Sequence, residues 1–174
     1  MNSINLAKVF AGNYEGFAPC TATAVMEILD YYNISLKGKH AVILGRSMVV
    51  GKPLSMMLLK KDETVTLCHS KTEHIDEISR TADVLVAAMG RANVVGAEYI
   101  KPGAVVIDVG INVDQDGKIH GDVNFDEVVN LASMITPVPG GVGSVTTAIL
   151  IKNIVKAARN FECSKPTAMV CELI

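Results

Sequence analysis

The sequence predicts an α/β protein with a Rossmann-like, doubly wound and mostly parallel sheet. Short apolar runs alternate with stretches of helical periodicity along the 174 residues, which is the pattern of βαβ units with right-handed crossovers. Hydrophobic residues make up 49% of the chain, aromatic residues only 5%, and tryptophan is absent. Such a composition suits buried parallel strands of Val, Ile, Leu and Ala under covering helices.

The individual elements follow from periodicity and from local start and stop signals. Pro53 lies where the first turn of a helix tolerates proline, and Pro102-Gly103 precedes an apolar run that reads as a strand. Helices are expected over 21–32, 52–60, 72–80, 124–131 and 145–161, and strands over 39–44, 64–68, 83–88, 104–109 and 133–136.

Composition also limits the classes of partner and compartment. The formal net charge of −2 gives no reason to expect a nucleic-acid or anionic-membrane partner. Four scattered cysteines and the lack of a signal-peptide pattern favour a reduced, cytoplasmic setting. Residues 128–151 carry no charge, but prolines and glycines interrupt them, so we expect a loop and a buried helix there and no membrane span.

A glycine-containing turn follows the first predicted strand. Gly45, Arg46 and Ser47 come directly after an apolar run, and Gly51 opens the next helical pattern. A helix N-terminus reached through such a turn offers free N–H groups to a phosphate. The pattern departs from G-x-G-x-x-G, since serine replaces the second glycine and the last glycine comes one residue later. Nucleotide binding and a plain chain reversal are the two interpretations.

The end of the second predicted strand bears on which nucleotide would bind. NAD-binding folds usually place an acid there to hold the ribose 2′-hydroxyl. Here the strand ends Cys68-His69-Ser70-Lys71, and no acid comes before Glu73. Arg46 and Ser70 could instead hold a 2′-phosphate, which favours NADP over NAD. The alternative is a solvated surface arginine.

Three further groups of residues invite functional readings. Cys68, His69 and His74 suggest a metal, but no fourth ligand is evident, and we expect none bound. The residues from Asp108 to Asn112 and those around Gly90 end strands, where they are either cofactor walls or simple turns. The glycine- and proline-rich loop over 136–146 contains Gly141 and Thr146 and opens a helix, another geometry suited to an anion or a carbonyl.

Taken together, these motifs resemble the bifunctional methylenetetrahydrofolate dehydrogenase/methenyltetrahydrofolate cyclohydrolase family. The resemblance runs in family order from about residue 17 to about residue 160. Its pieces are Pro19-Cys20-Thr21, Gly45-Arg46-Ser47 with Val50-Gly51, Cys68-His69-Ser70-Lys71-Thr72, Lys101-Pro102-Gly103, Asp108-Val109-Gly110-Ile111-Asn112, Gly121-Asp122-Val123 and Thr136-Pro137-Val138-Pro139-Gly140-Gly141-Val142-Gly143.

The resemblance implies NADP on the 45–47 turn, with Arg46 and Ser70 at the 2′-phosphate and Ile111 against the cofactor. The cofactor-binding set it implies is Gly45, Arg46, Ser47, Ser70, Gly90, Ile111, Gly141 and Thr146. The 136–143 loop would border the nicotinamide and the folate. The implied reaction oxidises 5,10-methylenetetrahydrofolate with NADP and then hydrolyses the methenyl product to 10-formyltetrahydrofolate. A homodimer is also implied.

The chain departs from the family in lacking the folate-binding half. That half carries a Tyr-x-x-x-Lys pair and a pterin-holding aspartate, whereas no tyrosine here is followed by lysine four residues later. We therefore expect no catalytic residue in this chain and an incomplete tetrahydrofolate site. The expected organisation is a residual connector over 1–18, an NADP-binding domain over 19–162 and a tail over 163–174. A fragment of a whole enzyme, half of a split enzyme and a non-catalytic NADP-binding module remain the alternatives.

Overall fold

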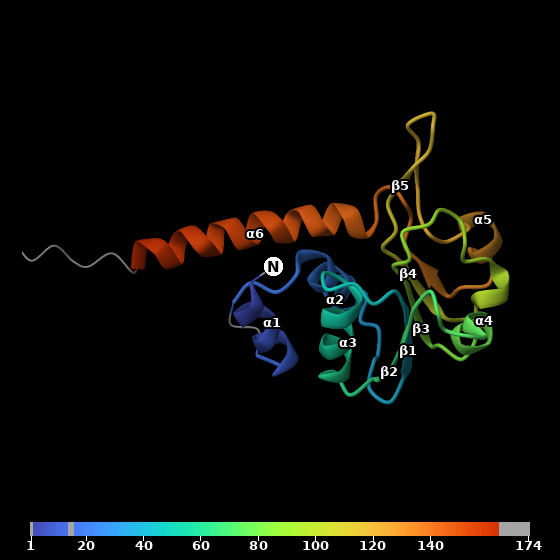
Figure 1. Ribbon diagram of the computed structural model, residues 1–174, viewed down its shortest axis with the longest axis horizontal. Helices are drawn as coiled ribbons and strands as arrows, with labels where there is room; N and C mark the ends of the chain where they lie inside the picture. The colour runs from blue at the N-terminus through green and yellow to red at the C-terminus, as the bar shows by residue number, and fades with distance from the viewer. Residues whose placement is uncertain (1, 14–15, 164–174) are drawn as a thin grey trace, which may run out of the picture.

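The computed structural model describes residues 2–13 and 16–163, and it centres on a five-stranded parallel sheet (Figure 1). The strand order is β2-β1-β3-β4-β7, with every neighbouring pair parallel. The strands are β1 (His40–Leu44), β2 (Thr64–Cys68), β3 (Val84–Ala87), β4 (Val105–Asp108) and β7 (Met134–Ile135). The predicted Rossmann-like fold class is confirmed.

Helices cover both faces of the sheet, as a doubly wound fold requires. Helices α1 (Ser3–Phe10), α2 (Cys20–Tyr31), α3 (Gly51–Leu59) and α6 (Val142–Cys163) lie on one side, and α4 (Ile75–Ser79) and α5 (Phe125–Val128) lie on the other (Figure 1). A short 3₁₀ helix, η1 (Ala97–Tyr99), precedes β4.

Strand β1 shows why the central strands read as unbroken apolar runs. Ala41 and Ile43 pack into the core under α2 and α3, whereas Val42 and Leu44 pack into the core under α4 and α5. All four side chains are fully buried. Because successive side chains of a strand point to opposite faces, a strand covered on both sides has to be apolar at every position.

Several elements differ from the sequence expectations. Residues 3–10 form α1, whose Val9 is buried against the core. An antiparallel hairpin of β5 (Asn112–Val113) and β6 (Ile119–His120) follows β4. Helix α4 is shorter than expected because His74, at its N-cap, adopts a left-handed conformation. The expected tail lies, from residue 164 on, outside the described residues.

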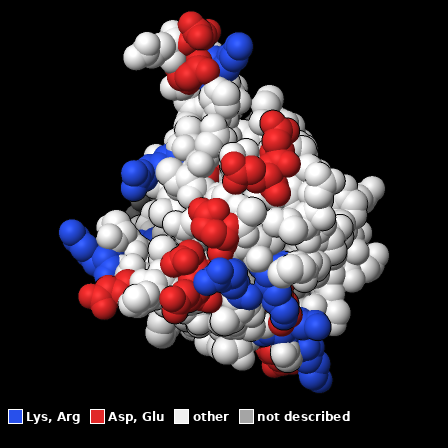
Figure 2. Space-filling view, turned by 90° about the vertical axis from the view of Figure 1, so that its right-hand side faces the viewer, with Lys and Arg blue, Asp and Glu red and all other residues white. Residues whose placement is uncertain are grey.

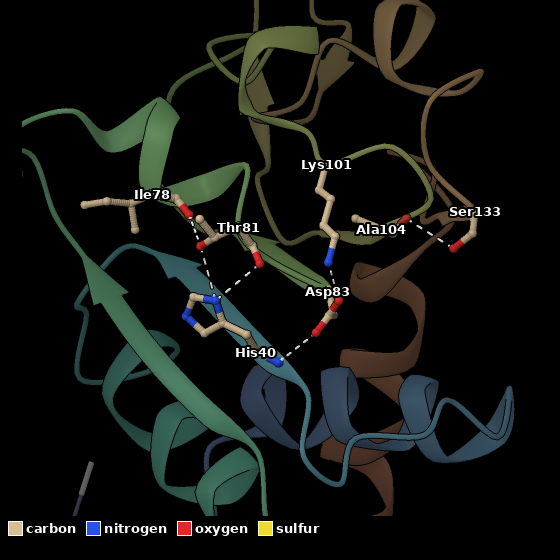
Figure 3. A network of polar contacts seen from close by, with 7 residues as sticks. All are labelled: His40, Ile78, Thr81, Asp83, Lys101, Ala104 and Ser133. Carbon is tan, nitrogen blue, oxygen red and sulfur yellow. Dashed lines mark hydrogen bonds and ion pairs between the residues drawn. The ribbon is translucent and has the colours of Figure 1, made fainter.

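A polar network joins the amino ends of the strands, at the edge opposite the turns singled out by sequence (Figure 3). Asp83 accepts the His40 N–H at 3.0 Å and the Lys101 ammonium at 2.7 Å. The His40 ring lies between Thr66 of β2, at 2.9 Å, and Thr81, at 3.2 Å. These contacts tie β1 to β2 and to the segment that enters β3, on the amino side of the sheet.

The surface has two features relevant to partners. The face over α4 and α5 carries both charge signs interspersed, and the protruding hairpin tip bears Asp114, Asp116 and Lys118 (Figure 2). Helix α6 extends beyond the sheet and past α1 (Figure 1). Within residues 2–13 and 16–163, no helix is long and apolar enough to cross a membrane.

Candidate functional site

The strand order places a crevice at the carboxyl edge of the sheet. From β1 the chain moves to β2 on one side, then crosses to β3 on the other. Ligands of doubly wound folds bind at such a switch point. Leu44 is in register with Cys68 and with Ala87, and Ala87 with Asp108. The ends of β2, β1, β3 and β4 therefore lie side by side, and each carries residues singled out by sequence.

The turn after β1 depends on two glycines. Gly45 has a φ of +132°, and a Cβ there would lie 2.1 Å from the Ala88 carbonyl oxygen of the β3 exit. A Cβ on Gly51, the first residue of α3, would lie 1.8 Å from the Gly45 carbonyl oxygen. Side chains cannot occupy these positions without moving the backbone. The glycines thus bring the start of α3 against the end of β1.

Some backbone N–H groups of this turn have no hydrogen-bond acceptor in the described part of the chain. The Val50 N–H donates to Ser47 Oγ at 3.1 Å and the Lys52 N–H to the Ser47 carbonyl at 3.1 Å. The N–H groups of Arg46 and Ser47 meet no acceptor in the described part of the chain. Arg46 is exposed and has no acidic partner among those residues, and the first turn of α3 contains no acid. The turn therefore suits an anion.

The β2 exit forms a tight turn beside it. The Gly45 N–H donates to the Cys68 carbonyl at 3.0 Å, which joins the two strand ends. The His69 N–H donates to Thr72 Oγ1 and the Thr72 N–H donates back to the His69 carbonyl. This closure leaves Ser70 exposed at the tip, one strand away from Arg46. Residues 68–72 supply no carboxylate for a ribose hydroxyl.

Within the 108–112 motif at the end of β4, Asp108 is buried whereas Ile111 is exposed. Asp108 is 3% exposed, and its carboxylate accepts the N–H groups of Gly110, Asp122 and Val123 at 2.9–3.0 Å. Burial raises the pKa of the Asp108 carboxyl although these three donors lower it. Asp108 therefore holds the β4 exit to residues 110, 122 and 123. Ile111, beyond it, is 63% exposed.

The sequence singled out Asp122 only as part of a family motif. Its carboxylate is fully buried and accepts the N–H groups of Met89, Gly90 and Arg91, which places Gly90 in the crevice wall. Gly90 has a φ of +67°, and the space where its Cβ would stand is open. No local pattern predicts these contacts, because Asp122 is more than thirty residues from the segment it holds.

The glycine-rich loop brings α6 to the same edge. Gly141 packs against the Pro137 carbonyl, where a Cβ would lie 2.4 Å from the oxygen. A Cβ on Gly143 would lie 3.6 Å from Ile111 Cδ1, so the start of α6 adjoins the β4 exit. Thr146 Oγ1 donates to the Val142 carbonyl at 2.8 Å within the helix. Ile111 and the start of α6 thus adjoin each other on the side of the sheet away from Arg46, and Gly141 and Thr146 flank that helix start.

A cavity of about 670 Å³ lies on the other side of this loop, between α2, β4, β7 and α6. Its lining is mainly aliphatic and aromatic, with Glu27 the one acid. The cavity does not include the 45–51 turn or Ser70. We place the candidate site at the 45–51 turn, because a bound dinucleotide needs hydrogen-bond donors for its phosphates.

In the described part of the chain, no group of three or more His, Cys, Asp or Glu side chains is placed to hold a metal ion.

Comparison with known proteins agrees with this geometry. Residues 19–162 match the family described as "Tetrahydrofolate dehydrogenase/cyclohydrolase, NAD(P)-binding domain". The chain is 62% identical over 152 residues to the bifunctional protein FolD of Carboxydothermus hydrogenoformans, covering 86% of this chain and 53% of that protein. It is 59% identical over 156 residues to FolD of Clostridioides difficile, covering 90% and 54%.

Solved structures of the same family also match this chain. The FolD methylenetetrahydrofolate dehydrogenase/cyclohydrolase of Campylobacter jejuni matches with a TM-score of 0.87 and 47% identity, over 90% of this chain and 56% of that one. The Trypanosoma brucei enzyme, complexed with NADP and an inhibitor, matches with a TM-score of 0.85 and 39% identity, over 91% and 57%. The chain spans about half the length of these relatives. It belongs to the tetrahydrofolate dehydrogenase/cyclohydrolase family, of which residues 19–162 match the NAD(P)-binding domain.

Proposed function

We propose that this chain binds NADP and supplies the cofactor-binding half of a methylenetetrahydrofolate dehydrogenase/methenyltetrahydrofolate cyclohydrolase. The observation that carries the proposal is the pair of neighbouring strand ends. Within residues 2–13 and 16–163, one strand end presents N–H groups without an acceptor and Arg46 without an acidic partner, and the next presents Ser70 with no acid in residues 68–72. A 2′-phosphate accepts hydrogen bonds from both side chains, whereas a 2′-hydroxyl would leave the guanidinium without an anion.

Different residues of this chain would bind different parts of the cofactor. The 45–47 turn would hold the pyrophosphate, with Arg46 and Ser70 on the 2′-phosphate. Ile111 adjoins Gly143 at the start of α6, on the opposite side of the crevice, and Gly141 and Thr146 flank that helix start. We expect Ile111, Gly141 and Thr146 to border the nicotinamide. When bound, NADP would supply the acceptor for the hydride of the methylene carbon. The protein contributes by holding the ring at a fixed distance from that carbon.

The folate-directed chemistry would need residues from the other half of the family's enzymes, whether in the same polypeptide or in a separate one. Helix α6 offers a surface for that half. Lys152, Asn153 and Lys156 contact Glu27, Cys20 and Gly16 on its inner side. On its other side an apolar stripe of Leu150, Ile151, Ile154 and Val155 is 45–59% exposed. Burying such a stripe against a partner domain is favourable.

A complementation assay tests this function. The chain alone should bind NADP yet neither oxidise 5,10-methylenetetrahydrofolate nor hydrolyse the methenyl compound. Adding the unmatched N-terminal portion of the Carboxydothermus hydrogenoformans relative as a separate polypeptide should produce NADP-dependent oxidation. Turnover by the isolated chain would refute the absence of a catalytic residue, and failure to bind NADP would refute the function itself.

A substitution on α6 tests whether the apolar stripe contacts the other half of the enzyme. Ile151→Glu places a charge on the apolar stripe, at a side chain that is 58% exposed, so the fold should tolerate it. It should weaken complementation while leaving NADP binding unchanged. Equal complementation by the variant would show that the stripe is not the contact surface.

We also propose that the chain forms a homodimer. The β5–β6 hairpin stands out from the domain (Figure 1), and it exposes Val113 at 66% and Ile119 at 42%. A projecting hairpin with two exposed apolar side chains below its charged tip is a surface that a second copy could cover. Sedimentation velocity measures the stoichiometry directly.

A further inference from the structure

The exit of β3 is held by a carboxylate from a distant segment. Asp122 Oδ2 accepts the N–H groups of Met89 and Gly90, and Oδ1 accepts the Arg91 N–H and the Asn112 amide, both at 2.9 Å. The carboxylate is fully buried, and no cation contacts it among the described residues. A buried carboxylate is costly unless its hydrogen bonds are made, and here four donors make them.

Asp108 in turn fixes the position of Asp122. Its Oδ1 accepts the Asp122 N–H at 3.0 Å and its Oδ2 accepts the Val123 N–H at 2.9 Å. Two glycines permit this packing, since a Cβ on Gly110 would lie 2.3 Å from Asp122 Oδ1 and one on Gly121 would lie 1.9 Å from Asp108 Oδ2. The two aspartates thus join the ends of β3 and β4 into one rigid unit.

The backbone N–H groups at the end of β3 have acceptors within the protein, unlike those of the 45–47 turn. Those of Met89, Gly90 and Arg91 are all committed to Asp122. Those of Arg46 and Ser47 meet no acceptor in the part of the chain that the structure describes. The free backbone donors of these two segments therefore lie on the β1 side of the crevice. The β3 exit, against which Gly45 packs, forms a wall in which the N–H groups of residues 89–91 are already bound.

On the function proposed above, the sheet order decides which half of the cofactor meets this wall. The 2′-phosphate end is anchored at the exits of β1 and β2. Strands β3 and β4 lie on the other side of β1, so the nicotinamide half must pass over the β3 exit. We propose that Asp122 is a positioning residue that fixes residues 89–91 as the wall for the nicotinamide half of NADP.

The test compares the whole dinucleotide with a fragment of it. Adenosine 2′,5′-bisphosphate contains the 2′-phosphate end and lacks the nicotinamide half. Asp122→Asn replaces one acceptor oxygen by an amide that cannot accept, so hydrogen bonds to residues 89–91 or to Asn112 are lost. Calorimetry should show NADP affinity reduced at least about tenfold, with affinity for the fragment changed by less than about twofold. A purely structural role would weaken both ligands alike.

Two further variants complete the experiment. Asp116→Asn, on the exposed hairpin tip, makes the same charge change and should affect neither ligand. Asn112→Ala removes one donor to Asp122 at a half-buried position, so it tests the proposal if Asp122→Asn does not fold, and it should give a smaller loss with the same selectivity. Equal losses for both ligands, or none, would overturn the proposal. Absence of NADP binding by the unaltered chain would instead overturn the proposed function.

Discussion

Replacing Arg46 with alanine is expected to weaken NADP binding by about 1.5–3 kcal/mol, the range for a lost hydrogen bond to a charged group. NAD binding should change much less, because NAD has no 2′-phosphate. The expectation rests on an exposed guanidinium without an acidic partner in the described residues, at the strand end next to the one that carries Ser70. The quantity to compare is the ratio of the two dissociation constants.

Titration calorimetry with both cofactors measures that ratio. Arg91→Ala is the matched control, since it removes an exposed arginine at the same edge of the sheet but on the β3 side of the crevice. Its NADP-to-NAD ratio should stay near that of the unaltered chain. If Arg46→Ala weakens both cofactors equally, Arg46 does not bind the 2′-phosphate.

The sheet was predictable because its signal is local. Strand β1 is apolar at four successive positions and is followed directly by Gly45, which indicates a turn, so the sequence predicts the end of the strand at Leu44. Strand β2 was predicted over the residues that form it. In the candidate site, the turn at Gly45 and Arg46 could be predicted for the same reason, since a strand, a turn and a helix start lie within twelve residues, and its role in phosphate binding stays a prediction.

The features that sequence reasoning missed depend on contacts between distant segments. Asp122 holds residues more than thirty positions away, and nothing in Gly121-Asp122-Val123 indicates a carboxylate that faces the interior. Helix α1 is short, and it is packed by tertiary contacts to α3. The β5–β6 hairpin has two-residue strands, too short for an alternating pattern to show.

Glu63 illustrates the same limit with a larger energetic consequence. It follows three exposed charged residues, Lys60, Lys61 and Asp62, yet Glu63 is only 2% exposed. Its position just before β2 directs the side chain inward, and neither carboxylate oxygen has a hydrogen-bond partner among the described residues. Burial, and secondarily the charge of Asp83, raises the pKa of the Glu63 carboxyl from 4.5 to about 7.

This pKa makes the stability of the chain depend on pH in a defined direction. Between about pH 4.5 and 7 the folded chain retains the Glu63 proton whereas the unfolded chain has released it. The unfolding free energy therefore falls as pH rises through this range and levels off above it. Glu63→Gln removes the titration, so the variant should exceed the unaltered chain by about 3 kcal/mol at pH 8, with the two similar below pH 4.5.

Urea denaturation at intervals from pH 4.5 to 8 measures the difference between the two proteins. The difference in unfolding free energy is the quantity to use, because the buried Asp108 carboxyl, whose pKa is also raised, contributes to the pH dependence of both proteins. Glu73→Gln makes the same chemical change at an exposed position and should retain the pH dependence of the unaltered chain. A constant difference between Glu63→Gln and the unaltered chain across the range would mean that Glu63 does not keep its proton on folding, and that its carboxylate finds a compensating donor.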